Sequence, residues 1–243
     1  MAAPVSYVLC GTPRTGSTLL CGLLSSTGVL GHPESYFRGP DEARWAEQFG
    51  LPTADGRALD FRAFATRARE AGSTPNGVFG VRIMWGSLDR PLHGLAHSSG
   101  SSDLAVLERA LGPLAFVHLR RDGLLEQAVS WCRAEQTGSW QHGDVASGSP
   151  QLDLDRLLGI RNTILAHNAA WQAWFQAQAI EPLVVTYEEV VGDPGAAVAD
   201  IAGHVSVEMP TGWRPLSRHR KQADEVNAAH VAALREVLQT EEP

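Results

Sequence analysis

A glycine loop near the start of the chain has the residue types and spacing of an anion-binding site. Residues 11–18, GTPRTGST, fit the frame G-x-x-x-x-G-x-[ST]. An apolar run precedes the loop and a leucine-rich helical pattern follows it, so its backbone N–H groups should meet an anion at a helix N-terminus. The alternative is a turn that only joins a strand to a helix. The register of both glycines, Arg14 and the Ser-Thr pair favours binding of a phosphate-like group.

The loop differs from that of nucleotide triphosphatases at one decisive position. Ser17 stands where those enzymes have lysine, and the chain has no lysine before Lys221. A kinase-like site uses that lysine on the β- and γ-phosphates, beside a magnesium ion. We therefore expect a smaller, less charged group than a triphosphate, with Arg14 as the cation. The sequence offers no constellation of metal ligands, and we expect no metal.

Four short apolar runs alternate with helical patterns, which predicts an α/β fold with a short parallel sheet and helices on both faces. The expected strands are 5–10, 78–85, 114–119 and 182–187. The expected helices are 17–26, 41–49, 60–71, 103–111, 124–135, 153–179 and 224–238, with another that begins at Asp193-Pro194. The length suits a single domain over 1–243.

Composition limits the class of protein. The formal net charge is −7, which disfavours a general nucleic-acid binder because such proteins present a basic face. No apolar run reaches membrane-spanning length, and the N-terminus resembles a buried strand more than a signal peptide. Cys10, Cys21 and Cys132 are odd in number and lack C-x-x-C spacing. We therefore expect buried thiols and a location in the reducing cytoplasm.

The motifs resemble those of a known enzyme family. PRTGSTLL at 13–20 is similar to the 5′-phosphosulfate loop of sulfotransferases, whose pattern is [RK]-x-G-[ST]-[ST], and residues 7–37 resemble the bacterial trehalose 2-sulfotransferase family. The likeness continues, in the same order, through 76–85, 116–140, 168–175, 185–194 and 220–225. The resemblance covers nearly the whole chain and is weakest across 38–75 and 195–215.

The resemblance implies a P-loop-like sulfotransferase fold and a reaction. The donor would be 3′-phosphoadenosine-5′-phosphosulfate (PAPS), and an acceptor hydroxyl would attack its sulfur in line. The product 3′-phosphoadenosine 5′-phosphate (PAP) would then leave, without help from a metal. The loop residues that would hold the donor are Arg14, Thr15, Gly16, Ser17 and Thr18. By analogy with phosphoryl transfer, positioning and electrostatics should supply most of the catalysis.

The resemblance also implies a site for the donor's 3′-phosphate. In the family a strand ends in Arg and the next helix contributes Ser, and the matching residues are Arg121 and Ser130. An Arg at the carboxyl end of a strand reaches the crevice where α/β folds bind ligands. Arg120 is adjacent and stays open as an alternative.

A basic segment near the C-terminus is a second candidate for that phosphate. Residues 211–224 include Arg220 and Lys221, and RKQAD resembles the loop that closes over the nucleotide in sulfotransferases. Lys221 is the single lysine of the chain, so it could serve a purpose that the planar guanidinium of Arg cannot. The alternative is a solvated basic turn, as most charge runs are.

The remaining chemistry is assigned to Arg82 and a carboxylate. Arg82 matches a basic position of the family, so it could stabilise the departing phosphate or serve as an ion-pair partner. The family carries its general base as the Glu of G-x-P-x-E-[FY]-F, whereas residues 31–37 read GHPESYF. Ser35 therefore occupies the position of the base. Glu34 is the first candidate to replace it, with His32 as a lesser one.

The acceptor is expected to be a hydroxyl of a sugar or another small metabolite, recognised by an irregular insertion at 32–76. Trehalose is one option among several because of Ser35. Two other functions stay open: a non-catalytic module that binds PAPS or PAP, and a P-loop kinase or phosphatase, which the missing lysine disfavours. The apolar pattern of 153–179 could pack internally or form the seam of a homodimer.

Overall fold

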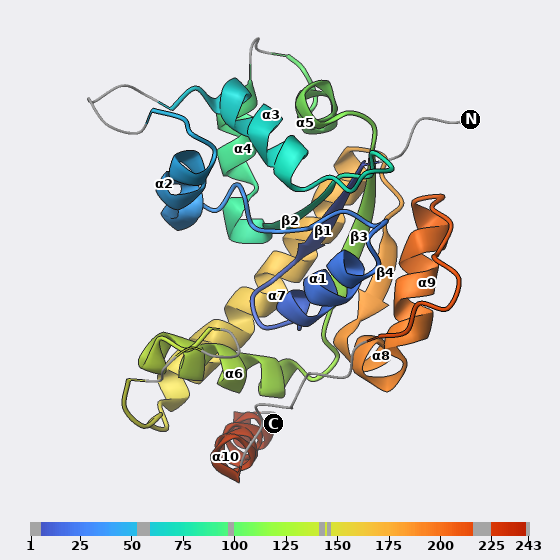
Figure 1. Ribbon diagram of the computed structural model, residues 1–243. Coiled ribbons are helices and arrows are strands. Elements are labelled where there is room, and N and C mark those ends of the chain that lie inside the picture. The colour runs from blue at the N-terminus through green and yellow to red at the C-terminus, as the bar shows by residue number, and fades with distance from the viewer. Residues whose placement is uncertain are drawn as a thin grey trace.

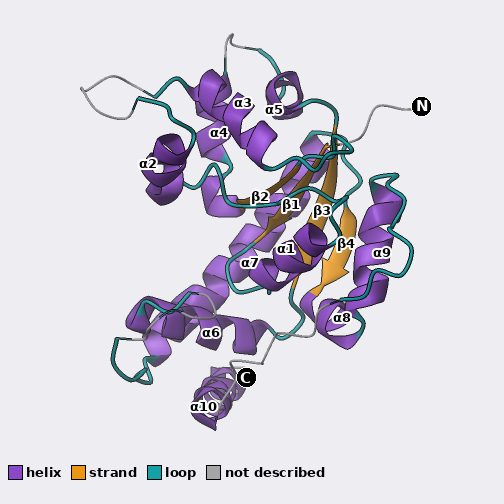
Figure 2. Ribbon diagram, viewed as in Figure 1, coloured by secondary structure: helices purple, strands orange, loops and turns teal. Residues whose placement is uncertain are grey.

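Four parallel strands form a sheet in the order β2-β1-β3-β4 (Figures 1 and 2). They are β1 (Ser6–Gly11), β2 (Gly80–Met84), β3 (Leu114–Arg120) and β4 (Leu183–Thr186). All four expected strands are confirmed, each within two residues of its predicted ends. The computed structural model describes residues 6–52, 59–96, 100–140, 144, 147–215 and 225–241.

The strand order places a topological switch point between β1 and β3. The chain leaves β1 to build β2 on one side, and it leaves β3 to build β4 on the other. Loops that depart in opposite directions leave a crevice at the carboxyl ends of the strands, where α/β folds bind ligands. The glycine loop follows β1 and the turn 121–123 follows β3, so both border this crevice.

Every expected helix is present, with ends shifted by at most three residues. The helices are α1 (Ser17–Ser26), α2 (Gly39–Gln48), α3 (Phe61–Ala71), α4 (Asp89–Leu95), α5 (Asp103–Leu111), α6 (Leu124–Thr137), α7 (Leu154–Ala177), α8 (Tyr187–Gly192), α9 (Pro194–His204) and α10 (Glu225–Glu241), with a 3-10 turn η1 (Trp85–Ser87). The carboxylate of Asp193 caps α9 by accepting from the N–H of Ala196 at 2.9 Å, as predicted. Helices α4 and α8 were not predicted.

Helices cover both faces of the sheet (Figure 1). Alternate strand residues face opposite sides, which gives two apolar layers. Tyr7 and Leu9 of β1 face α1, α8 and α9, whereas Val8 and Cys10 face α7 with α3 and α5. The indole N–H of Trp171 in α7 donates to the carbonyl of Gly11 at 2.9 Å, which fixes the end of β1 just before the glycine loop.

A third apolar cluster joins α6, the first half of α7 and α10 beyond the carboxyl ends of the strands (Figure 1). Leu157, Ile160 and Ile164 of α7 are buried there, and its later apolar residues are buried under the sheet. The apolar stripe of this helix is therefore covered within the chain, and a homodimer stays a prediction. All three cysteines are buried and unpaired, as expected. Among the described residues, no helix combines the length and apolar character needed to cross a membrane.

The described parts of the expected insertion, 32–52 and 59–76, are packed into the core. They contribute an aromatic cluster to the core, in which Tyr36 contacts Trp45, with ring centroids 4.9 Å apart, and Phe49 contacts Phe64, with centroids 5.4 Å apart. A bidentate ion pair between Arg90 and Glu42 fastens α2 to α4 through contacts of 2.6 and 2.7 Å.

Candidate active site

The glycine loop brings the N-terminal turn of α1 to the crevice. Arg14 and Gly16 both have left-handed backbones, with φ of 68° and 79°, and these two residues bend the loop. Among the described residues, no side chain caps α1, so its first N–H groups are available to an anion. The hydroxyl of Thr15 is turned inward and donates to the carbonyl of Thr12 at 3.0 Å. Thr15 can therefore serve a ligand through its backbone, while its side chain holds the loop.

A buried amide on α6, that of Gln127, holds the glycine loop in place. The Nε2 of Gln127 donates to the hydroxyl of Thr12 at 2.7 Å and to the carbonyl of Pro13 at 2.8 Å. Gln127 is fully buried, so these bonds are made in a low-dielectric environment where they are strong. No local pattern predicts this contact, because 115 residues separate the partners.

Tyr187, the first residue after β4, packs directly against the loop. A Cβ on Gly16 would lie 2.5 Å from a ring carbon of Tyr187, so the ring occupies the space that glycine leaves. The guanidinium of Arg121 lies over the same ring, with its Cζ 4.5 Å from the Tyr187 centroid. Sequence reasoning missed Tyr187, although its place at the end of a predicted strand was a usable signal.

Arg14, Arg121 and Ser130 come together at the crevice, as the resemblance implied. The Nε of Arg14 donates to the hydroxyl of Ser130 at 2.9 Å, and one Nη donates to the carbonyl of Trp140. Arg121 donates from an Nη to the carbonyl of Arg14 at 3.2 Å. Its Nε is buried and has no partner among the described residues. A buried donor of this kind is costly unless a ligand satisfies it.

Positive charge concentrates around Arg14. Burial lowers the pKa of Arg14, the nearby charges of Arg121 and Arg133 lower it further, and the charge of Asp144 opposes them. Arg133 follows Ser130 by one helical turn and donates to Asn227 of α10 at 3.1 Å. Like charges held close together cost free energy unless an anion offsets them, so this cluster favours a phosphate-like ligand. Arg133 was not among the predicted site residues.

Arg120 and Arg121 lie in different surroundings, because neighbouring residues of a strand point to opposite sides. Residues of β3 alternate, and His118, two residues before Arg120, contacts the rings of Trp171 and Phe175 under the sheet. Arg120 continues that side and contributes to lowering the pKa of His118. Arg121 instead lies against the glycine loop and Tyr187.

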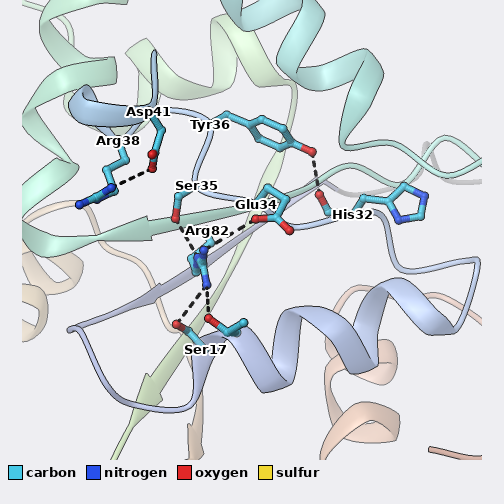
Figure 3. Close-up of polar contacts among 9 residues, drawn as sticks. Ser17, His32, Glu34, Ser35, Tyr36, Arg38, Asp41 and Arg82 are labelled. Atoms are coloured by element: carbon cyan, nitrogen blue, oxygen red, sulfur yellow. Dashed lines mark hydrogen bonds and ion pairs between the residues drawn. The ribbon is translucent and has the colours of Figure 1, made fainter. Parts of the chain in front are cut away.

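Arg82 of β2 connects the α1 N-terminus to residues 34 and 35 (Figure 3). Its Nη1 donates to the hydroxyl of Thr18 at 3.1 Å and makes a longer contact of 3.4 Å with that of Ser17. Its Nε donates to the hydroxyl of Ser35 at 2.8 Å, and Nη2 lies 3.7 Å from a carboxylate oxygen of Glu34. Arg82 is thus both an ion-pair partner and part of the candidate site.

The segment that carries Glu34 is fixed to the free edge of β2. Glu34 forms a parallel bridge with Val81, and its carbonyl accepts from the N–H of Arg82 at 3.0 Å. Tyr36 anchors the segment by donating to the carbonyl of His32 at 2.9 Å. The side chain of Glu34 stays 51% exposed, so a substrate can reach its carboxylate. The ring of His32 points away from Arg82 (Figure 3), which disfavours it as the base.

The predicted site residues therefore form two adjoining groups. Arg14, Arg121 and Ser130 lie toward α6, while Arg82, Glu34 and Ser35 lie toward β2, with the loop between them. Arg220 and Lys221 fall outside the described residues. Within the residues that the structure describes, no group of three or more His, Cys, Asp or Glu side chains is placed to hold a metal ion.

Comparisons with known proteins show which proteins this chain resembles. Residues 6–236 match the Stf0 sulphotransferase family. A trehalose 2-sulfotransferase of Mycolicibacterium smegmatis is 28% identical and aligns with 90% of this chain and 96% of its own length. A trehalose 2-sulfotransferase of Mycobacterium tuberculosis is 29% identical over 80% of this chain and 82% of its own.

A solved structure has the same fold. The sulfotransferase domain from the curacin biosynthetic pathway superposes with a TM-score of 0.52 at 11% identity, over 93% of this chain and 82% of that domain. At this identity the likeness concerns the fold alone. The family match spans nearly all of the chain, so the protein belongs to the Stf0 sulphotransferase family and is an enzyme that transfers a sulfuryl group.

Proposed function

We propose that the protein transfers the sulfuryl group of PAPS to a hydroxyl of a sugar or another small metabolite and releases PAP. The position of Arg82 is the observation that supports this most strongly. It links an uncapped helix N-terminus, suited to an oxyanion, to the exposed carboxylate of Glu34. An anion site beside an accessible base is what transfer to a hydroxyl requires.

The nucleotide would lie across the glycine loop. In this proposal the backbone of residues 14–18 holds the 5′ end of the donor, and Arg121 with Ser130 holds the 3′-phosphate. The buried Nε of Arg121 fits that role because the phosphate would supply its missing acceptor. The guanidinium of Arg14 bonds to Ser130, so we assign Arg14 to the junction between the two phosphates. We also propose that Arg220 and Lys221, in the segment 211–224, bind the 3′-phosphate.

The catalytic residues would be Glu34, Arg82 and Arg14. The donor supplies an activated sulfuryl group, whose bond to the phosphate oxygen breaks as the bond to the acceptor oxygen forms. Glu34 takes up the proton that the acceptor hydroxyl loses. Arg82 and Arg14 stabilise the negative charge that develops on the departing phosphate, with help from the N–H groups of the loop.

The acceptor would be bound by the insertion at 32–76, within a single sulfotransferase domain that spans 1–243. Both curated relatives are named for trehalose, so trehalose is the first acceptor to test. Ser35 replaces the carboxylate of the family pattern, and therefore we propose the class of acceptor and not one sugar. The buried, unpaired thiols favour a reducing compartment, and we propose the cytoplasm.

The experiment is a transfer assay with purified protein, PAPS and a panel of acceptors that includes trehalose, other sugars and small hydroxylated metabolites. Mass spectrometry should find an acceptor that gains one sulfuryl group, with an equal amount of PAP formed, in the presence of EDTA. A sulfated product that forms only with magnesium, or no product with any acceptor, would contradict the proposal.

A further inference from the structure

A carboxylate that has no role so far lies at the start of α6. Glu188, the second residue of α8, accepts a hydrogen bond from the N–H of Asp122 at 3.1 Å through Oε2. Its Oε1 accepts from the N–H of Gly123 at 3.2 Å. The partners are 65 and 66 residues apart, so one side chain joins the end of β4 to the turn that follows β3.

These contacts occupy the N-terminus of α6. Gly123 is the residue that precedes the helix, and no side chain from the helix's own N-terminus caps it. Glu188 therefore holds the two residues that lead into α6, with its negative charge near the positive end of the helix dipole.

The turn held by Glu188 is the one that carries Arg121. The two N–H groups that Glu188 binds belong to the residues directly after Arg121, so they fix where its backbone leaves β3. The neighbouring side chain, Tyr187, lies under the guanidinium of Arg121 and against Gly16. Two consecutive residues of α8 thus hold Arg121 from both ends, one through the backbone and one through the side chain.

We propose that Glu188 is a positioning residue for recognition of the 3′-phosphate, through its hold on the backbone that follows Arg121. This inference rests on the proposed function. Glu188 would act through the backbone and not on the substrate, since each of its oxygens binds a backbone N–H group. Without this hold, Arg121 loses its orientation toward the phosphate, and the protein loses discrimination between nucleotides with and without that group.

Glu188→Gln tests this with a nearly isosteric change. An amide NH2 in place of one oxygen faces a backbone N–H, so one of the two bonds is lost. By isothermal titration calorimetry, the Kd for PAP should rise by about tenfold, the effect of one lost hydrogen bond, while the Kd for AMP should change less than about twofold. The side chain in Glu188→Asp is too short to reach both N–H groups. This variant should also raise the ratio of the Kd for PAP to the Kd for AMP.

Glu189→Gln is the matched control. Glu189 also accepts from backbone, at 2.7 Å from the N–H of Thr186, but it caps α8 and does not reach the turn. This variant should lower the melting temperature and keep the PAP-to-AMP ratio of the parent. An unchanged ratio in both Glu188 variants, or an equal loss in Glu189→Gln, would overturn the inference. A parent protein with equal affinity for PAP and AMP would overturn the proposed function itself.

Discussion

The Nε of Arg82 lies 2.8 Å from the hydroxyl oxygen of Ser35, at the position where the family pattern has its glutamate. A neutral hydroxyl therefore takes the contact with the guanidinium that a carboxylate would otherwise make. Glu34 meets the same guanidinium from one residue earlier, at 3.7 Å and with half of its side chain exposed. The looser pairing leaves the Glu34 carboxylate accessible to an acceptor, which is the basis for assigning the proton transfer to it.

Replacement of Arg82 should damage catalysis more than folding. Arg82→Lys keeps a positive charge but cannot bond to Thr18, Ser35 and Glu34 at once, because a lysine lacks the planar fork. We expect kcat to fall by about 10²–10³-fold, as when a preorganised donor is removed from an active site. Steady-state rates of PAP release measure this. Arg38→Lys, on an exposed pair with Asp41, should keep the parent rate, and an equal loss there would contradict the account.

Arg14→Ala should weaken nucleotide binding. The change removes charge-assisted bonds to the nucleotide and the contact with Ser130, at a cost of about 1.5–3 kcal/mol. This corresponds to a Kd for PAP that is about 10 to 150 times higher. Calorimetric titration gives the value directly. Binding to the parent protein should survive EDTA, and its loss on chelation would indicate a metal-dependent site like that of a kinase.

Gly16→Ala should lower both stability and PAP affinity. The added Cβ would lie 2.5 Å from Tyr187, and the backbone of residue 16 has a φ of 79° that alanine adopts poorly. We expect a loss of at least about 1–3 kcal/mol in the free energy of unfolding. Gly22→Ala lies inside α1, the helix that Gly16 precedes, with no atom within 4 Å of the new Cβ, and it should stabilise the protein by up to about 1 kcal/mol. Equal effects of the two changes in denaturant titrations would contradict this.

Stability should fall with acid through His118. Burial, helped by the charge of Arg120, lowers the pKa of His118 to about 4. In the unfolded chain its pKa is about 6.5, so between these values the unfolded state binds a proton that the folded state does not. The free energy of unfolding should therefore fall by about 2–4 kcal/mol as the pH falls from 6.5 to 4.

His118→Gln removes this titration. Its free energy of unfolding should decline less than that of the parent over the same pH range, as measured by urea denaturation. The exposed His32→Gln should retain the full decline. A parallel pH dependence for His118→Gln and the parent would show that the imidazole does not titrate as described.

The fold was largely predictable because its signals are local. Apolar runs mark all four strands, and helix caps such as Asp193 are set by neighbouring residues. Helix α4 was missed because its sequence, DRPLHGL, contains proline and glycine. The ion pair of Arg90 with Glu42, which is distant in sequence, holds this helix against α2. Helix α8 was missed because it is short, although Thr186 and Glu189 form a capping box at its start.

The site was predictable only where it follows a contiguous motif. The glycine loop could be recognised in this way, and the resemblance to sulfotransferases implied Arg121 and Ser130. The contacts of Gln127 with the loop, of Tyr187 with Gly16 and of Glu188 with the turn join segments more than 60 residues apart. No local pattern encodes such pairs, because they depend on the order of strands in the sheet. The contacts of Arg82 are also non-local, because its partners lie in α1 and in residues 34 and 35, which pair with the edge of β2.

The most direct test of the account is the turnover of Glu34→Gln on a confirmed acceptor, measured as PAP release, together with its Kd for PAP. The change keeps the shape of the side chain and removes its basicity. Turnover should fall by about 10²–10⁴-fold with nucleotide affinity nearly unchanged, and Ser35→Ala should have little effect because a serine hydroxyl is a poor base. Ser35→Glu should give no gain, since a second carboxylate beside Glu34 adds repulsion. Full turnover in Glu34→Gln, or a faster Ser35→Glu enzyme, would contradict the account.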